Sequence, residues 1–546
     1  MLELSNRPSH IKSLDDQERY WAYNGLDTCI TAEVGAALLP MMDKNQQAIY
    51  DFERTCRAPA LQMQILGFRI DEPERRKLHR ERKADGKRWQ RELDVIVKKI
   101  RQEDRISWRG DLQIAKDDYL YTKALVEGEK GKELRKKGRK TLTVMRQAIK
   151  QLELSVEKTL GFQWGKGLPP STKQLQDFIF NDMGVPEQTN HKGIVSMDKE
   201  VCKRVRKKFP KTKECIDLVL KLRDWQKQIE VLDEKNLSSD GRFRASFAVG
   251  QTETGRWSST ADVYKQGDNL QNKDRRIRRI FLADVGKRFL NVDLSQAESC
   301  CIAHLAGDQA YIDAHDTGNV HVVAGRIFWP DLSWTGDDKT DKMMMKQTPV
   351  SWIAQAPVKP GEEPAFHYYD MAKRAQHGLN YGLTEYGLAI WLGVTRIEAL
   401  RLLQAYFGRY FMLPEYHKFI KHVIKTKGVI TSPLGRTRQF FGRPWDKATV
   451  REALANTPQG MTVDILDIAL LRIWHHMVPD KVTLHQQGHD AILSQAVADE
   501  TTLPAIRTEI MEHMIVPVPV EGLDGVTRTM VIPAEMEEGT NWRDLK

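Results

Sequence analysis

The sequence predicts an α+β protein, because helix-like and strand-like patterns occupy separate stretches of its 546 residues. Residues 55–235 are strongly charged with a helical pattern, and residues 309–425 are also mostly helical in pattern. Glycine and turn residues multiply in SSDGRFRASF (238–247), which indicates a hairpin and a change to β structure. Further on, a helix is expected after PQG (458–460), and VTLHQQ and AILSQ predict a second hairpin around a Gly-His-Asp bend (482–495). This length suggests about three or four domains.

The composition is that of an ordinary globular protein, with 41% hydrophobic and 29% charged residues. Its six cysteines form no Cys-x-x-Cys pair, which favours reduced core thiols over a disulfide or zinc framework. No apolar run is long enough to span a membrane, and the N-terminus lacks the apolar region of a signal peptide. We therefore expect a cytoplasmic protein with no membrane partner.

The positive charge leaves two interpretations open. A net charge of +10 indicates either a polyanionic partner, most simply nucleic acid, or a well-solvated basic surface. The run GEKGKELRKKGRK (128–140) is likewise typical of a solvated face or loop, or of an arm that follows phosphates.

Asp293 lies where a predicted strand, Phe289–Val292, meets a segment with helical spacing. Ser295 and Glu298 fit the S-x-x-E pattern of a capping box, in which case Asp293 is a turn residue beside the cap. A carboxylate at the end of a strand is also rigidly held and exposed, as a divalent-metal ligand must be. A second carboxylate is needed to decide between the two.

Asp490 is the candidate for that second carboxylate, at the tip of the predicted hairpin. Taken alone, an aspartate at a turn simply accepts local amide hydrogen bonds. If Asp490 and Asp293 lay within a few ångströms, they would repel each other unless divalent cations lay between them. Two metal ions ~3.5–4 Å apart can hold both the attacking and the leaving oxygen of a phosphoryl transfer.

Six sequence motifs follow one another along the chain: QTETGRWSST (251–260), NLQN (269–272), VDLSQAE (292–298), KRAQHGLNYGLTEYGLA (373–389), REALANTPQG (451–460) and QGHDAIL (487–493). Together they resemble the conserved blocks of family A DNA polymerases, the polymerase-I-like group that includes bacteriophage replicative enzymes. STKQLQDFIF (171–180) and SMDKEV (196–201) resemble the thumb of that family more weakly. The resemblance covers roughly residues 240–500.

The resemblance implies a right-hand polymerase with an antiparallel β palm, helical fingers and a helical thumb. The expected domains are a remnant of the 3′–5′ exonuclease C-terminus or docking segment (1–50), a thumb (51–240) with a basic insertion (about 103–150), the first part of the palm (241–308), the fingers (309–430) and the second part of the palm (431–546).

In this family, two catalytic aspartates correspond to Asp293 and Asp490, and the resemblance implies that they hold two Mg²⁺ ions, for which Mn²⁺ can substitute. The backbone carbonyl of Leu294 is the expected further metal ligand. Lys373 matches the lysine of the fingers helix, which neutralises the triphosphate and protonates the leaving pyrophosphate.

Substrate contacts carry over in the same way. The nucleotide-binding positions correspond to Gln296, Glu298, His321, Lys373, His377 and Tyr381, and the DNA-binding positions to Arg256, Asn269, Gln271, Arg451, Gln459 and His489. Glu298 matches the glutamate that excludes a ribose 2′-hydroxyl, and Tyr381 matches a ring beside the templating base. His321 is either a triphosphate contact or a buried structural histidine.

Three positions depart from the family pattern. Tyr369 stands where an arginine normally binds the triphosphate, His377 where a Phe or Tyr stacks on the sugar, and Ala491 where a third carboxylate is usual. Arg374 is a candidate for the missing charge, although it points about 100° away from Lys373 on an ideal helix.

The expected function is therefore template-directed, replicative DNA synthesis from primer–template DNA and dNTPs. The alternatives are an inactive DNA-binding subunit derived from a polymerase and a single-subunit RNA polymerase, against which Glu298 argues. Tyr23 and Asp27 fit the last motif of the 3′–5′ exonuclease, but its upstream D-x-E motif is missing. We therefore expect no proofreading by this chain. Either the exonuclease is a separate subunit that docks on the N-terminal segment, or the sequence is a truncated piece of a longer protein.

Overall fold

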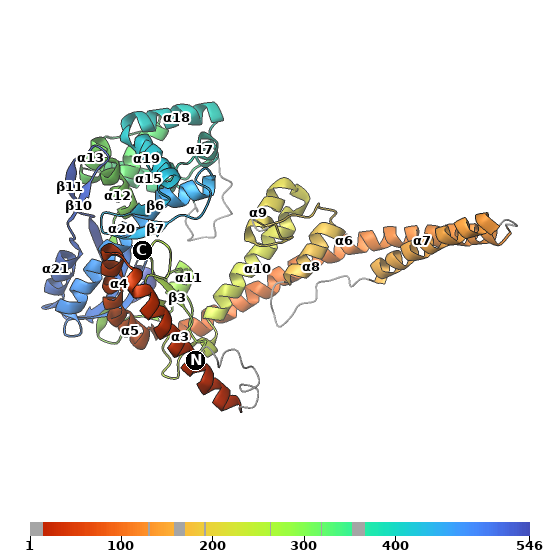
Figure 1. The fold of residues 1–546 in the computed structure, drawn as a ribbon, viewed down its shortest axis with the longest axis horizontal. Helices are drawn as coiled ribbons and strands as arrows, with labels where there is room; N and C mark the ends of the chain where they lie inside the picture. The colour runs from red at the N-terminus through yellow and green to blue at the C-terminus, as the bar shows by residue number, and fades with distance from the viewer. Residues whose placement is uncertain are drawn as a thin grey trace. The chain divides into compact units, whose positions relative to one another are not determined.

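The computed structural model describes residues 15–128, 132–157, 170–190, 193–262, 264–317, 319–351 and 366–545 (Figure 1). The chain divides into two compact units, the first made of Met1–Arg69 and Gly241–Lys546 and the second of Ile70–Asp240. APVKPGEEP (356–364), which reads as a Pro- and Gly-rich insertion, lies outside the described residues. Among the helices of the described ranges, none combines the length and apolar character that a membrane crossing requires.

The second unit is helical, as its charge pattern predicted. Its longest helices, α6 (Glu72–Gly128) and α7 (Lys132–Glu157), lie side by side and run antiparallel (Figure 1). Gly138 permits their close approach, because a Cβ there would lie 2.4 Å from Cγ2 of Val126. A 3.0 Å ion pair between Lys116 and Glu153 joins the same two helices.

Shorter helices complete the core of this unit. They are α8 (Thr172–Gln176), the π-helical turn η2 (Asp177–Asp182), α9 (Lys199–Lys208), the turn η3 (Pro210–Thr212), α10 (Lys213–Val231) and the turn η4 (Glu234–Asn236). Ser171 and Asp198 cap α8 and α9, so STKQLQDFIF and SMDKEV each contain the start of a helix. Leu93, Phe178 and Leu222 are fully buried where α6, η2 and α10 meet.

Four antiparallel strands form the central sheet of the first unit. Their order is β12 (Ala534–Gly539), β5 (Lys287–Leu294), β9 (Ala491–Val497) and β8 (Val482–Gln487). The strand predicted around Phe289 and the hairpin predicted around Asp490 are both confirmed. Phe289 and Leu290 are both fully buried, and neighbouring side chains point to opposite faces, so both faces of β5 are covered.

Helices α5 (Arg57–Leu66), α20 (Lys447–Met477) and α21 (Leu503–Met514) pack on this sheet. Phe68, just after α5, stacks on Trp542 at 5.4 Å and contacts Phe281 at the same distance. The two compact units divide after Arg69, because α5 and Phe68 bury their apolar side chains in the core of the first unit.

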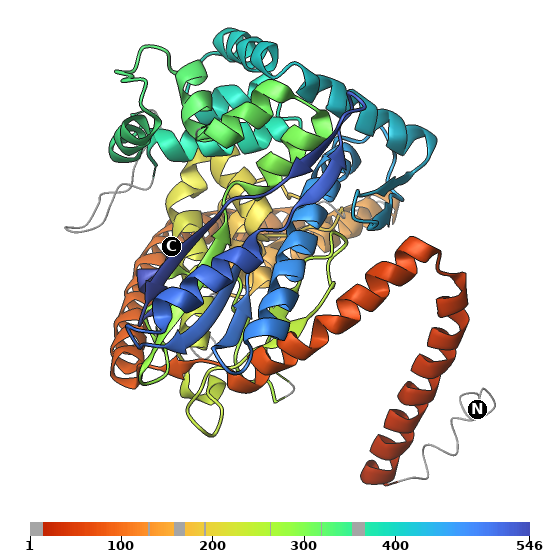
Figure 2. The ribbon, with the colours of Figure 1, turned by 90° about the vertical axis from the view of Figure 1, so that its left-hand side faces the viewer.

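The helices between Gln309 and Thr426 gather at the top of Figure 2, in green to cyan. They follow α12 (Ala297–Ala306) and are α13 (Gln309–Thr317), α14 (Val320–Phe328), α15 (Asp338–Gln347), α16 (Tyr368–Asn380), α17 (Glu385–Leu392), α18 (Arg396–Arg409) and α19 (Met412–Thr426). Tyr311 and Tyr410 stack at 4.4 Å in their core. The mostly helical region predicted after Asp308 is confirmed.

Smaller elements complete the description. They are α3 (Asp16–Leu38), η1 (Leu39–Met41), α4 (Lys44–Thr55), β1 (Arg69–Ile70), β2 (Ser246–Ala248), β3 (Ser258–Thr260), α11 (Arg275–Arg278), β4 (Phe281–Leu282), β6 (Val429–Thr431), β7 (Thr437–Gln439), β10 (Val518–Glu521), β11 (Thr527–Met530) and η5 (Trp542–Asp544).

The hairpin and the change to β structure predicted from residues 238–247 onward are confirmed, since β2, which begins at Ser246, pairs antiparallel with β3. One local boundary was wrong. The helix expected after PQG already begins at Lys447 and includes Pro458. Proline cannot donate the backbone hydrogen bond of its turn, but the long buried face of α20 keeps the helix continuous.

Candidate active site

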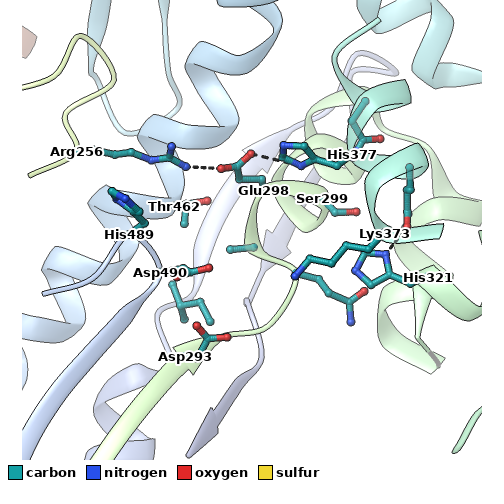
Figure 3. Close-up of a pocket in the computed structure, with 15 residues that line it drawn as sticks. Arg256, Asp293, Glu298, Ser299, His321, Lys373, His377, Thr462, His489 and Asp490 are labelled. Carbon is teal, nitrogen blue, oxygen red and sulfur yellow. Dashed lines mark hydrogen bonds and ion pairs between the residues drawn. The ribbon is translucent and has the colours of Figure 1, made fainter. Parts of the chain in front are cut away.

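Two carboxylates from distant parts of the chain meet at one end of the central sheet. Asp293 lies near the end of β5 and Asp490 in the turn between β8 and β9. The Leu294 backbone N–H donates to the Asp490 carbonyl at 2.8 Å, and Ala491 pairs directly with Asp293. Both side chains line the same pocket, as Figure 3 shows.

The pocket concentrates negative charge around Asp293. Burial, and then the nearby Asp490 carboxylate, raise the pKa of Asp293 well above its usual range, whereas Lys373 opposes the shift. Glu535, which pairs with Asp293 across β12 and β5, adds a further raising contribution together with Glu537. Such a group of carboxylates favours a cation between them.

The donor chemistry fits magnesium. Asp293 and Asp490 offer hard carboxylate oxygens, and Leu294, which also lines the pocket, offers a backbone carbonyl, which are the ligand types that Mg²⁺ prefers. Within the described ranges, no group of three or more His, Cys, Asp or Glu side chains is already arranged as a metal cage. Mg²⁺ commonly takes its remaining ligands from water and substrate phosphates, so a protein that supplies two carboxylates can bind it.

The capping box predicted for Ser295 and Glu298 does not form. Helix α12 starts one residue after Gln296, which adopts a left-handed conformation (φ 56°) and caps the helix with no side-chain hydrogen bond. The backbone N–H of Ser295 donates to the Pro533 carbonyl at 2.7 Å instead. This contact with the segment before β12 holds Ser295 out of the helix and leaves the Glu298 carboxylate for the pocket.

Glu298 is the centre of a polar network. Its Oε1 accepts an ion-paired hydrogen bond from Arg256, and its Oε2 accepts the Tyr381 hydroxyl proton. His377 Nδ1 lies 3.9 Å from Oε2, and the dashed lines of Figure 3 connect Arg256, Glu298 and His377. Burial lowers the pKa of His377 even though Glu298 opposes the shift, which favours a neutral imidazole at pH 7.

Helix α16 presents Lys373 and His377 to the pocket from one face, four residues apart. The Lys373 side chain extends toward the two aspartates in Figure 3. His321 lies beside it, with Nδ1 2.6 Å from Gln376 Oε1, and burial lowers the pKa of His321 to about 4. His321 is therefore a neutral, firmly held histidine that lines the pocket, so both sequence interpretations of it remain possible.

The surroundings of Tyr369 differ from the sequence expectation. Arg374 does not provide the missing charge, since its guanidinium lies over the Phe366 ring, 4.6 Å from the centroid. Two lysines of α15 flank Tyr369 instead, with Nζ of Lys342 and Lys346 at 5.8 and 5.2 Å from its ring. Sequence reasoning missed both, because they lie more than twenty residues before α16.

The expected DNA-binding residues fall into two groups. Arg256 and His489 line the main pocket, and Gln271 lines an adjoining pocket that also contains Asp293 and Asp490. Asn269 Oδ1 accepts a hydrogen bond from the Ser259 hydroxyl at 3.1 Å, which holds the loop of Asn269 in place. Arg451 and Gln459, on α20, are not among the residues that line these two pockets. Pocket residues that sequence reasoning missed are Ser299, Gln376, Asn380 and Thr462 in the main pocket and Arg278 and Asn291 in the adjoining one.

Curated relatives are bacterial DNA polymerases I. The enzyme of Caldicellulosiruptor bescii is 25% identical over 395 residues, which cover 69% of this chain and 41% of that protein. The enzyme of Treponema pallidum is 26% identical over 419 residues, which cover 73% of this chain and 36% of that protein. The enzyme of Mycobacterium tuberculosis is 28% identical over 314 residues, which cover 56% of this chain and 31% of that protein. The chain thus spans less than half the length of each of these relatives.

A solved structure and a family model agree with these relatives. The polymerase domain of Pol1 from M. smegmatis, in complex with DNA primer-template and dNTP, superposes with a TM-score of 0.55 at 19% identity. The match covers 90% of this chain and 70% of that one, and it supports a shared fold. The model of DNA polymerase family A matches residues 135–335 and 355–544. The chain therefore belongs to DNA polymerase family A.

Proposed function

We propose that this chain is a template-directed DNA polymerase that adds deoxynucleotides to a primer 3′-hydroxyl by two-metal phosphoryl transfer. The observation that carries the proposal is the meeting of Asp293 and Asp490 in one pocket, from segments almost two hundred residues apart. The M. smegmatis structure, which holds primer-template and dNTP, supports the same substrates. A replicative role is part of the proposal.

In this proposal the two units divide into the parts of a polymerase hand. The palm comprises residues 241–308 and 431–546, with the central sheet at its base. The fingers comprise residues 309–430, and the thumb comprises residues 51–240, most of which form the second unit, Ile70–Asp240. Residues 1–50 are proposed to be a remnant of a 3′–5′ exonuclease C-terminus or a docking segment. Helix α3 has exposed Ile30, Val34 and Leu38 at every fourth position, which supports a protein contact along this face.

Asp293, Asp490 and the Leu294 carbonyl would hold the metal ions. When bound, two Mg²⁺ ions supply activation of the primer hydroxyl and neutralisation of the triphosphate. Lys373, on the facing helix α16, is placed to bind the triphosphate and to donate a proton to the leaving pyrophosphate. We further propose that Lys342 and Lys346 supply the positive charge that the family places at the position of Tyr369.

Glu298 would distinguish deoxyribose from ribose. Arg256 and Tyr381 hold its carboxylate from two sides, so the group cannot move away from a 2′-hydroxyl without breaking both hydrogen bonds. Arg256 and His489 would meet the primer terminus beside Asp490, where arginine can read hydrogen-bond acceptors that every correct base pair offers. Gln296, whose Oε1 is buried without a hydrogen-bond partner within the described ranges, is proposed to contact the nucleotide.

Primer extension tests the proposal directly. The chain is expected to extend a labelled primer on a template with four dNTPs and Mg²⁺, and Asp293→Ala and Asp490→Ala are each expected to reduce the rate at least ~10²–10³-fold. Asp480→Ala, which removes an exposed aspartate of the same compact unit, is the matched control and should keep its rate. If the wild-type chain binds primer–template but never extends it, the inactive-subunit alternative is right and this proposal is wrong.

A further inference from the structure

Asp467 on α20 is a buried carboxylate outside the pocket. Its side chain is almost wholly inaccessible, with 1% of the residue exposed. Its Oδ2 accepts Nε1–H of Trp257 at 2.9 Å, and its Oδ1 accepts Nε2–H of Gln487 at 3.1 Å. Burial raises the pKa of Asp467 to about 8, and the two N–H donors oppose that shift by stabilising the ionised form.

The two donors belong to two different segments of the candidate site. Trp257 directly follows Arg256, the residue whose guanidinium binds Glu298. Gln487 is the last residue of β8, three positions before Asp490, and its backbone carbonyl accepts from Gln271 at 3.1 Å. One side chain of a long, buried helix thus holds both the loop of Arg256 and the turn of Asp490.

A second contact ties the same loop to the same helix. Gly255, on the other side of Arg256, has φ 80°, and a Cβ there would lie 2.3 Å from Cζ of Arg436. Arg436 in turn binds Asp464 on α20 at 2.6 Å. Asp464 and Asp467 are three residues apart and share one face of the helix. Gly255 therefore packs against a side chain that is bound to α20, and Trp257 is bonded to α20 directly.

We propose that Asp467 is a positioning residue that keeps Arg256 and Asp490 in one geometry at the primer terminus. The inference rests on the proposed polymerase function, since alignment of these two groups matters only if a primer end lies between them. Asp467 itself touches neither metal nor substrate. Its effect comes from geometry, because a displacement of ~1 Å at a reacting centre can cost about 10²-fold in rate.

The substitution Asp467→Asn tests the positioning role, because it removes the charge and leaves the side chain almost the same shape. The amide that replaces the carboxylate has one accepting oxygen, so either Trp257 or Gln487 then faces an N–H group. We expect kcat for single-nucleotide addition to fall about ten- to hundredfold, while KM for the dNTP and Kd for primer–template change less than about threefold.

A second substitution should rescue the first. With Asp467→Asn and Gln487→Glu together, the amide introduced at 467 donates to the carboxylate introduced at 487, and its oxygen still accepts from Trp257. Gln271 Nε2, 3.5 Å from Gln487 Oε1, is a second donor for that carboxylate. The double variant is expected to return to within about threefold of the wild-type kcat.

Asp308→Asn is the matched control. Asp308 is also fully buried and also accepts hydrogen bonds at both oxygens, among them those from the backbone N–H groups of Tyr311 (3.1 Å, to Oδ1) and Met412 (2.9 Å, to Oδ2). The Asp308→Asn variant should lose about as much thermal stability as Asp467→Asn but keep the wild-type kcat per folded molecule. Equal losses of kcat in the two single variants, or no rescue by Gln487→Glu, would overturn the inference.

Should Asp467→Asn fail to fold, Trp257→Phe removes one donor without adding a buried polar group. A wild-type kcat in that variant would also overturn the inference, whereas a kcat loss at unchanged Tm would support it. A wild-type chain that does not extend primers refutes the proposed function itself, so the two failures are distinguishable.

Discussion

Replacing Glu298 with alanine is expected to let ribonucleotides into the site. A 2′-hydroxyl in the space of the carboxylate must displace it from both Arg256 and the Tyr381 hydroxyl. A hydrogen bond to a charged group contributes about 1.5–3 kcal/mol, so breaking the two costs about 3–6 kcal/mol. Since 1.4 kcal/mol is a factor of ten, Glu298→Ala should lower the preference for dNTP over rNTP ~10²–10⁴-fold.

Glu298→Gln separates the shape of the side chain from its charge. The amide oxygen can still accept from Arg256, and its N–H can donate to the Tyr381 hydroxyl, which accepts as well as donates. The side chain of the Glu298→Gln variant then makes the same two hydrogen bonds as the wild-type carboxylate but carries no charge. We expect an intermediate loss of preference, about tenfold, because neutral hydrogen bonds are roughly half as strong.

The assay is single-nucleotide incorporation on one primer–template, with kcat/KM measured for dGTP and for GTP opposite the same template base. Glu415→Ala is the control, since Glu415 is an exposed glutamate of α19 paired only with a surface lysine in the described structure. An unchanged dGTP:GTP ratio in Glu298→Ala, within about threefold, would refute the reasoning. Such a result would mean that the carboxylate does not lie against the sugar.

Three further outcomes are expected. Lys342→Ala and Lys346→Ala should each raise KM for dNTPs about three- to tenfold with little change in kcat, because a partly screened charge contact contributes about 1 kcal/mol. The control variant Lys418→Ala, on α19, should leave KM for dNTPs unchanged. Arg436→Met should destabilise the protein by about 3–5 kcal/mol in urea unfolding, because Asp464 stays buried without its cation, and Asp464→Leu in the same chain should recover most of that loss. A 3′-labelled mismatched primer incubated with Mg²⁺ and no nucleotides should stay intact, and robust shortening would contradict the expected lack of proofreading.

Local patterns predicted the elements that carry the two aspartates. The alternation around Phe289 and the bend around Asp490 depend on neighbouring residues, and both formed as expected. The capping box failed for a non-local reason, because the Ser295 N–H is satisfied by Pro533, more than two hundred residues later. Where a distant backbone group supplies the hydrogen bond, no short sequence pattern can reveal it.

The departures from the family pattern illustrate the same limit at the site. Tyr369 and Ala491, read from the sequence, suggest that charged groups have been lost and so favour an inactive subunit. In space, Lys342 and Lys346 of α15 flank Tyr369, and Glu535 of β12 lies opposite Asp293, the residue that pairs with Ala491. A subunit that only binds DNA would have no reason to keep cations beside Tyr369 and a further carboxylate beside Asp293. The charges around these two residues therefore favour the proposed polymerase over a subunit that only binds DNA.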